Sequence, residues 1–183
     1  MWKGKLILTY PNDDDAVLYL FTLIVNQYGW PWIEKLSQQD VHWVRGTATS
    51  TTNLDRSTTT AALSFSSNLI NSTHLASKQT VDHHVQWPQT AGIFASTDRP
   101  ESAKLFLSWL MSDEMQASLA ASGSQLTRAG IINTTAAVWE ERSVAATQFA
   151  KFMSNREVVK WWRFQFETAL GTVQGASPLT YGI

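Results

Sequence analysis

The spacing of apolar positions changes near the start of the chain, and this change predicts a strand followed by a helix. Lys5 to Tyr10 is a short, mostly apolar run of the kind found in buried strands. Apolar residues then recur every three to four positions up to Gly29, as on one face of a helix. Asn12 or Asp13 is the expected N-cap, because short polar side chains accept hydrogen bonds from the first turn.

Strands and helices continue to alternate as far as Ser66. A short helix is predicted from Pro31 to Gln38 or Gln39, since proline is tolerated in a first turn. Val41 to Arg45 predicts a second strand, and Ala61 to Ser66 predicts a third. Threonine and serine dominate Thr47 to Thr60, where hydroxyls compete for backbone hydrogen bonds and weaken the case for a helix. The alternation indicates an α/β sheet.

The second half of the chain is predicted to be mostly helical. A polar segment, Ser67 to Asp82, is interpreted as a connector between two lobes. Trp109 lies on the apolar face of a predicted helix and is expected in the core. Strands are predicted at His84–Trp87 and Ala91–Ser96. Helices are predicted to begin at Pro100, after Ser112 and at Ser143, and the second of these ends near Gly123. A last helix is predicted to begin at a capping box, Ser154–Glu157, and to end before Gly171.

Composition limits the classes of protein that this chain can represent. Its 183 residues, 44% of them hydrophobic, suffice for one compact core or two small lobes. A net charge of −1 provides no global attraction for nucleic acid or an anionic membrane. The longest apolar run, Ala16 to Val25, is shorter than the roughly 18 residues that a membrane span needs. The first residues do not resemble a signal peptide, and the lack of cysteine excludes disulfides.

Two polar clusters follow predicted strands and are candidates for a ligand site. Asn12 to Asp15 stands at a strand end, where the residues either cap the next helix or bind a cationic or polar ligand or a hard metal, since three carboxylates cancel the attraction for a naked anion. Arg45 ends the second predicted strand, where it is either a surface residue or a fork that holds a ligand carboxylate or phosphate. The residues that would add donors beside Arg45 are Gly46, Thr47, Thr49, Ser50 and Thr51.

Other motifs give little support for metal binding or catalysis. Asp82-His83-His84 invites a metal hypothesis, but adjacent histidines on a strand point to opposite faces, so they do not easily share one ion. No nucleophile elbow, phosphate-binding loop or zinc motif occurs. The sequence therefore predicts no enzyme activity, no cofactor and no metal site. Asn71 and Asn133 each begin a sequon that a eukaryotic secretory pathway recognises.

Three blocks of the sequence resemble one known family. They are Trp2 to Leu6 before the first strand, Val44 to Thr47 before a hydroxyl-rich helix start, and Gly92 to Gln116, which contains Arg99-Pro100-Glu101-Ser102-Ala103-Lys104. Together they resemble type 2 periplasmic solute-binding proteins, in particular the iron-type substrate-binding family of ABC importers, including its fungal members. The resemblance implies a type 2 periplasmic-binding-protein-like α/β lobe in residues 1–70. It also implies a crossing back to first-lobe strands and a largely helical remainder in residues 71–183.

The resemblance also implies a function, which is to bind a small polar ligand in a cleft between lobes that close on it. The implied partner is an ABC permease, and the implied location is periplasmic or extracellular. The candidate ligand-binding residues are Asn12, Asp13, Arg45, Gly46, Thr47, Thr49, Ser50, Thr51, Ser66 and Trp87.

Two departures from the family pattern keep other hypotheses open. Family members are roughly twice this length, so much of a first lobe is expected to be missing. An exposed lobe face would then favour a second copy of the chain or another protein as partner. Ferric binders use adjacent tyrosines near the return crossing, where this chain has Ser64 to Asn68, so iron chelation of that kind is not expected. A third hypothesis is a metal-dependent hydrolase that uses Asp13 to Asp15 with His83 or His84.

Overall fold

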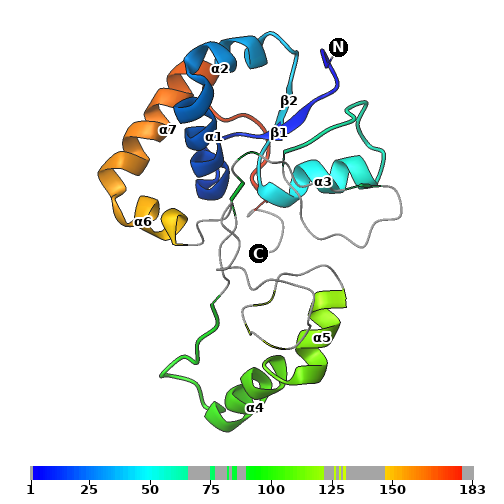
Figure 1. The fold of residues 1–183 in the computed structure, drawn as a ribbon, viewed down its shortest axis with the longest axis vertical. Coiled ribbons are helices and arrows are strands. Elements are labelled where there is room, and N and C mark those ends of the chain that lie inside the picture. The colour runs from blue at the N-terminus through cyan, green and yellow to red at the C-terminus, as the bar shows by residue number, and fades with distance from the viewer. Residues whose placement is uncertain are drawn as a thin grey trace.

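The computed structural model describes residues 2–65, 75–76, 82, 84–85, 90–121, 126, 128, 130 and 147–178. The described part is a mixed α/β protein that is mostly helical (Figure 1). Its elements in chain order are β1 (Ile7–Thr9), α1 (Asp15–Tyr28), α2 (Trp30–Ser37), β2 (His42–Val44), α3 (Thr47–Asp55), α4 (Pro100–Leu110), α5 (Asp113–Ala121), α6 (Gln148–Ser154) and α7 (Arg156–Leu170).

The sheet consists of two parallel strands joined by a helical crossover. β1 pairs with β2 in a register that sets Ile7 opposite His42 and Thr9 opposite Val44. The third strand predicted from Ala61 to Ser66 is reduced, within the described residues, to one parallel bridge between Leu6 and Leu63. β1 therefore lies between β2 and this bridge. Both strand predictions at the start of the chain are confirmed.

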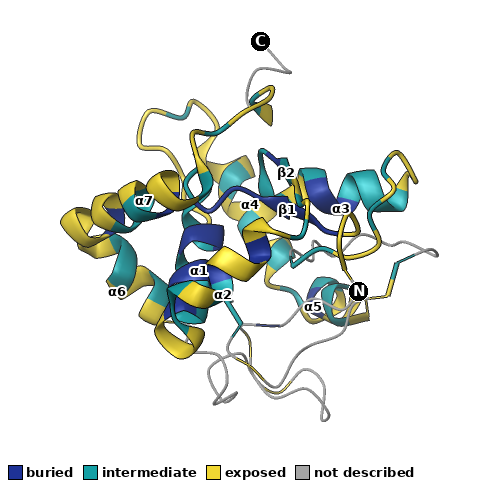
Figure 2. Ribbon diagram, turned by 90° about the horizontal axis from the view of Figure 1, so that it is seen from above, coloured by how far each residue is buried: buried dark blue, intermediate teal, exposed yellow. Residues whose placement is uncertain are grey.

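The core lies where α1, α2 and α7 pack beside β1. Figure 2 shows buried positions on β1 and α1, while α6 has exposed and intermediate positions and the outer face of α7 is exposed. Aromatic rings join distant parts of the chain here, because Phe21 of α1 contacts Phe166 of α7 edge to face at 5.8 Å. The buried residues of this cluster are Leu6, Leu8, Val17, Leu18, Phe21, Val25, Ile33, Leu36, Val159 and Phe166.

α3 forms in the threonine-rich segment, where the residue pattern only weakly predicts a helix. The hydroxyl of Thr51 donates to the carbonyl of Ala48 at 3.1 Å, and that of Ser50 donates to Thr47 at 3.5 Å. These bonds satisfy the hydroxyls inside the helix, so that both side chains are buried beside β1. Tertiary packing thus overrides a low intrinsic preference for helix.

Two predicted helix caps were each wrong by one or two residues. Asp14, and neither Asn12 nor Asp13, caps α1 by accepting hydrogen bonds from the N–H groups of Ala16 and Val17 at 2.9 and 3.0 Å. Asn155 caps α7 by accepting from Val158, in place of the predicted Ser154–Glu157 box. The predicted Ser112 cap of α5 is confirmed, because its hydroxyl accepts from the N–H of Met115.

α4 and α5 pack against each other and lie apart from the sheet and its helices (Figure 1). The turn between them is closed by the side-chain amide of Gln116, which donates to the carbonyl of Leu110 at 2.8 Å. The expectation that Trp109 belongs to the core was wrong, since this side chain is 50% exposed. Residues 91–96, predicted as a strand, form irregular structure and a turn.

No helix in the described part of the chain is long and apolar enough to span a membrane.

Candidate functional site

The carboxyl ends of β1 and β2 meet at one edge of the sheet, where two turns lie side by side. β1 leads through Tyr10 into the turn at residues 11–13, and β2 leads into the turn at Arg45 and Gly46. The amide of Tyr10 donates to the carbonyl of Val44 at 3.1 Å, and its ring stacks on Trp43 with centroids 5.4 Å apart. Crevices outside the carboxyl ends of parallel strands are the usual ligand sites of α/β proteins.

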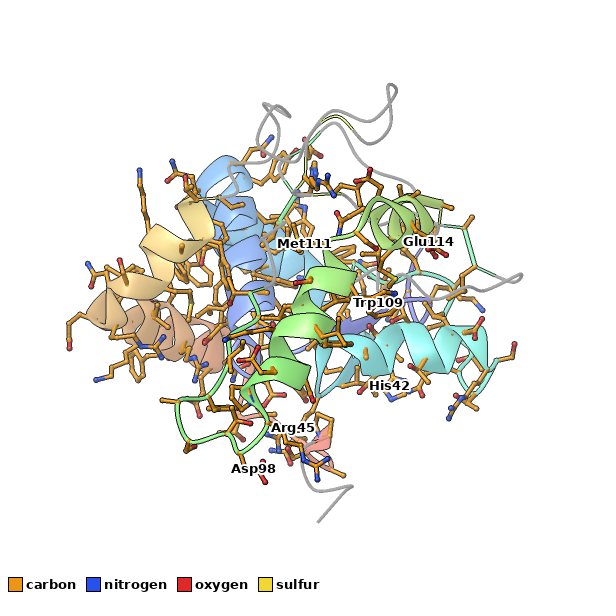
Figure 3. All side chains as sticks on the ribbon, turned by 90° about the horizontal axis from the view of Figure 1, so that it is seen from below. His42, Arg45, Asp98, Trp109, Met111 and Glu114 are labelled. Atoms are coloured by element: carbon orange, nitrogen blue, oxygen red, sulfur yellow. The ribbon has the colours of Figure 1, made fainter. Side chains whose placement is uncertain are left out.

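Arg45 and Asp13 join the two turns. The Nε and Nη2 atoms of Arg45 both donate to the same oxygen, Oδ1 of Asp13, at 3.1 and 2.8 Å. The side chains of Arg45 and Asp13 are 29% and 13% exposed, so this ion pair is partly shielded from water. The hydrogen bond to Asp13 raises the pKa of Arg45 further above its ordinary value, and the guanidinium stays charged. His42 is the first residue of β2 and Arg45 directly follows its last, and both are labelled in Figure 3.

The other two carboxylates of the acidic run have structural partners. Asp14 caps α1, as described above. Asp15 lies in the first turn of α1 and forms a close ion pair with Arg163 of α7 and a longer one, at 4.0 Å, with Arg156. Asp15 thereby ties the start of α1 to α7. These contacts agree with the capping and first-turn interpretation of the run.

The N-terminus of α3 adds backbone donors beside Arg45. Gly46 is the N-cap and offers no side-chain hydrogen bond to the helix. Its φ of 80° is a conformation that favours glycine, and its carbonyl accepts from Thr9 Oγ1 at 3.1 Å. Thr47 and Thr49 are half-buried in the first turn of α3, whereas Ser50 and Thr51 are buried with their hydroxyls bonded inside the helix.

Asn12 completes the described part of the site from the β1 side. Its Nδ2 donates to the carbonyl of Gly171 at 3.2 Å, across 159 positions of sequence. Its Oδ1 is buried and has no hydrogen-bond partner among the described residues. A buried acceptor without a donor costs about 1–3 kcal/mol, and a ligand gains affinity by donating to it only where the surrounding chain opens.

The sequence did not indicate the segment that contacts these turns from the C-terminal end. The ring of Pro178 lies against Gly46, with its Cγ 2.7 Å from the position that a Cβ of residue 46 would occupy. Gly171 was predicted only as the residue that ends α7. No local pattern in the sequence relates Gly171 or Pro178 to positions more than 100 residues earlier.

Several candidate residues lie outside the site or outside the described residues. Ser66, Trp87, His83 and both sequon asparagines, Asn71 and Asn133, are not among the described residues. Asp82 is described, and its Oδ1 accepts from the hydroxyl of Tyr28 at 3.0 Å. No group of three or more potential metal-ligating side chains occurs in the described ranges.

A hollow on the surface lies away from the strand ends. It has a volume of about 280 Å³ and lies between α2 and α7, where Trp30, Ile33, Glu34, Ser37 and Ala169 line it. Ligand pockets for drug-sized molecules are typically about 300–1,000 Å³, so this hollow falls just below that range. Its two polar side chains form no arrangement typical of recognition. We therefore place the candidate site at the strand ends.

Comparison with protein-family models finds none that matches this chain, and comparison with curated protein sequences finds no match.

Proposed function

We propose that this chain binds a small polar solute that carries an anionic group, at the carboxyl ends of β1 and β2. The observation that carries the proposal is the Arg45–Asp13 pair, which joins the two strand-end turns beside the N-terminus of α3. We further propose that the chain acts as a solute-binding protein of the ABC-importer type, with a type 2 lobe, outside the cytoplasm and with a permease as its partner. No catalytic role is proposed.

The chemistry of the site favours an anion with a neighbouring donor group. The pair leaves Nη1 of Arg45 without a hydrogen bond to the described residues, and the N-terminal end of α3 carries a partial positive charge. Asp13 fixes the guanidinium in place, which lowers the entropy that ligand binding must remove. The free Oδ1 of Asn12 requires a donor. A carboxylate or phosphate with a nearby hydroxyl or amine meets both requirements.

A thermal-shift screen tests this proposal. The full chain would be heated with inorganic phosphate, amino acids, polyamines, sugars and divalent metals, each in separate wells. A ligand at 100 times its Kd stabilises the folded state by about 2.7 kcal/mol, so one solute class should raise the Tm measurably. We expect Arg45→Ala to abolish that response. Arg56→Ala is the matched control, because Arg56 is an exposed arginine at the other end of α3.

If Arg56→Ala and Arg45→Ala lower the ligand-induced rise in Tm equally, the ligand is attracted by the overall charge of the protein, and the proposed site is wrong. Absence of any response from the anionic solutes would also contradict the proposal.

The exposed apolar face of α4 favours a second candidate function, which is association with another protein or with a second copy of this chain. Leu105 is 72% exposed and Phe106 54% exposed, and no residue of α4 is buried. Contiguous exposed apolar residues typically mark interaction surfaces. Light scattering over a concentration series tests the copy-to-copy form. We expect any dimer of the unaltered chain to be lost in a Leu105→Ser, Phe106→Ser variant.

A further inference from the structure

The segment from Gly171 to Pro178, which we call the C-terminal strap, lies across the proposed site. Its first residue accepts a hydrogen bond from the side-chain amide of Asn12, and its last contacts Gly46. The strap therefore touches both strand-end turns, one at each of its ends. These contacts connect the C-terminal part of the chain to two of the proposed ligand-binding residues.

The ring of Pro178 lies against the backbone of Gly46, the N-cap of α3. Its Cγ lies 2.7 Å, and its Cβ 3.2 Å, from the position of a Cβ on residue 46. Real Cβ atoms do not accept such a contact, so the ring fits only because residue 46 is glycine. The same bare backbone is what would allow an anionic group to approach the first turn of α3.

We infer that the C-terminal strap is an autoinhibitory element, which blocks the anion site at Arg45 and Gly46 until a solute displaces it. This inference rests on the proposed function and adds its regulation. The apparent affinity of the chain is then its intrinsic affinity multiplied by the fraction of molecules in which the strap is open.

The strap is held in a way that is compatible with release. Thr172, Gln174, Gly175 and Ala176 are exposed. The side-chain amide of Gln174 turns back onto the carbonyl and hydroxyl of Thr172, at 3.2 and 2.9 Å, and so stabilises the strap internally. Displacement of the strap removes the contact of Pro178 with Gly46.

Inorganic phosphate is the probe for the test, and its Kd would be measured by calorimetry for three proteins. These are the full chain, a chain that ends at Gly171, and Pro178→Ala. Ending the chain at Gly171 keeps the residue that terminates α7. We expect the shortened chain to bind phosphate about tenfold more tightly than the full chain, with Pro178→Ala between them, because both raise the open fraction. Pro100→Ala is the matched control, as Pro100 opens α4 away from the strap.

Hydrogen exchange provides a readout that does not depend on the ligand. Amides at residues 46–49 should exchange faster in the shortened chain and in Pro178→Ala, and should be unchanged in Pro100→Ala. If the shortened chain fails to fold, Pro178→Ala decides the question alone.

The outcomes distinguish the two proposals. Tighter phosphate binding after strap removal, with faster exchange, supports the inference. Equal phosphate affinity in all the proteins overturns the inference and leaves the proposed function standing. Failure of every protein to bind phosphate overturns the proposed anion site, and the inhibitory role of the strap with it.

Discussion

Two regions of this molecule contain similar amphipathic helices and use them differently. α7 places Val159 and Phe166 in the core, where both are fully buried against α1 and α2. α4 has the same kind of apolar face, but none of its residues is buried. The pattern of a sequence thus determines that a helix has an apolar face, while the partner of that face depends on long-range packing.

The largest expected difference in the free energy of unfolding is between two variants that each replace one phenylalanine, Phe166 in α7 or Phe106 in α4. Phe166→Ala should lower the free energy of unfolding by about 3–5 kcal/mol, because it leaves a cavity in the core. Phe106→Ala in α4 should change it by no more than about 0.5 kcal/mol, because that side chain is already 54% exposed. Urea unfolding followed by circular dichroism measures both. Equal losses would mean that α4 is packed against the core or a second copy in solution.

Two helix caps give the next contrast. Asp14→Ala removes two hydrogen bonds at the start of α1 and should cost about 1 kcal/mol in global unfolding. Ser112→Ala removes the corresponding bond at the start of α5. Its effect on global unfolding should be smaller, because α5 packs on α4 and lies apart from the core. The same urea experiment compares the two variants, and a larger loss for Ser112→Ala would show that the α4–α5 pair unfolds together with the sheet.

Much of the local structure could be predicted from the sequence. The helical spacing that ends at Gly29 corresponds to α1, and the short apolar runs correspond to β1 and β2, because each signal is local and strong. The predictions that failed depended on context. α3 formed despite its threonines because its hydroxyls bond inside the helix, and Trp109 is exposed because α4 lacks a covering element in the described structure.

The candidate site was predictable only in part, for a similar reason. The sequence predicts that Asn12, Asp13, Arg45 and Gly46 lie at strand ends, and the parallel pairing of β1 with β2 brings them to one edge. Parallel pairing also explains the contact between Asp13 and Arg45, since it places successive strand ends side by side. The contacts of Gly171 and Pro178 arise from packing between the two ends of the chain. No spacing rule in the sequence encodes them.

The smallest expected effect concerns Tyr28 at the end of α1, which reaches the stretch of chain that precedes α4. Its hydroxyl donates to Asp82, and this hydrogen bond, with some desolvation and the nearby negative charge, raises the pKa of Tyr28 above its ordinary value of 10.0. A raised pKa means that the folded state favours the neutral phenol. The stability gained from this bond is therefore complete below the ordinary tyrosine pKa and is lost as the pH rises through the folded pKa.

The phenolate absorbance of the folded chain measures this pKa, and Tyr28→Phe identifies which part of the titration belongs to Tyr28. Asp82→Asn should move the pKa of Tyr28 down toward its ordinary value, because it removes both the negative charge and the stronger acceptor. An unchanged titration in Asp82→Asn would mean that residue 82 does not stay beside α1 in solution. The stretch of chain before α4 would then be held less closely to the sheet and its helices than the hydrogen bond from Tyr28 indicates.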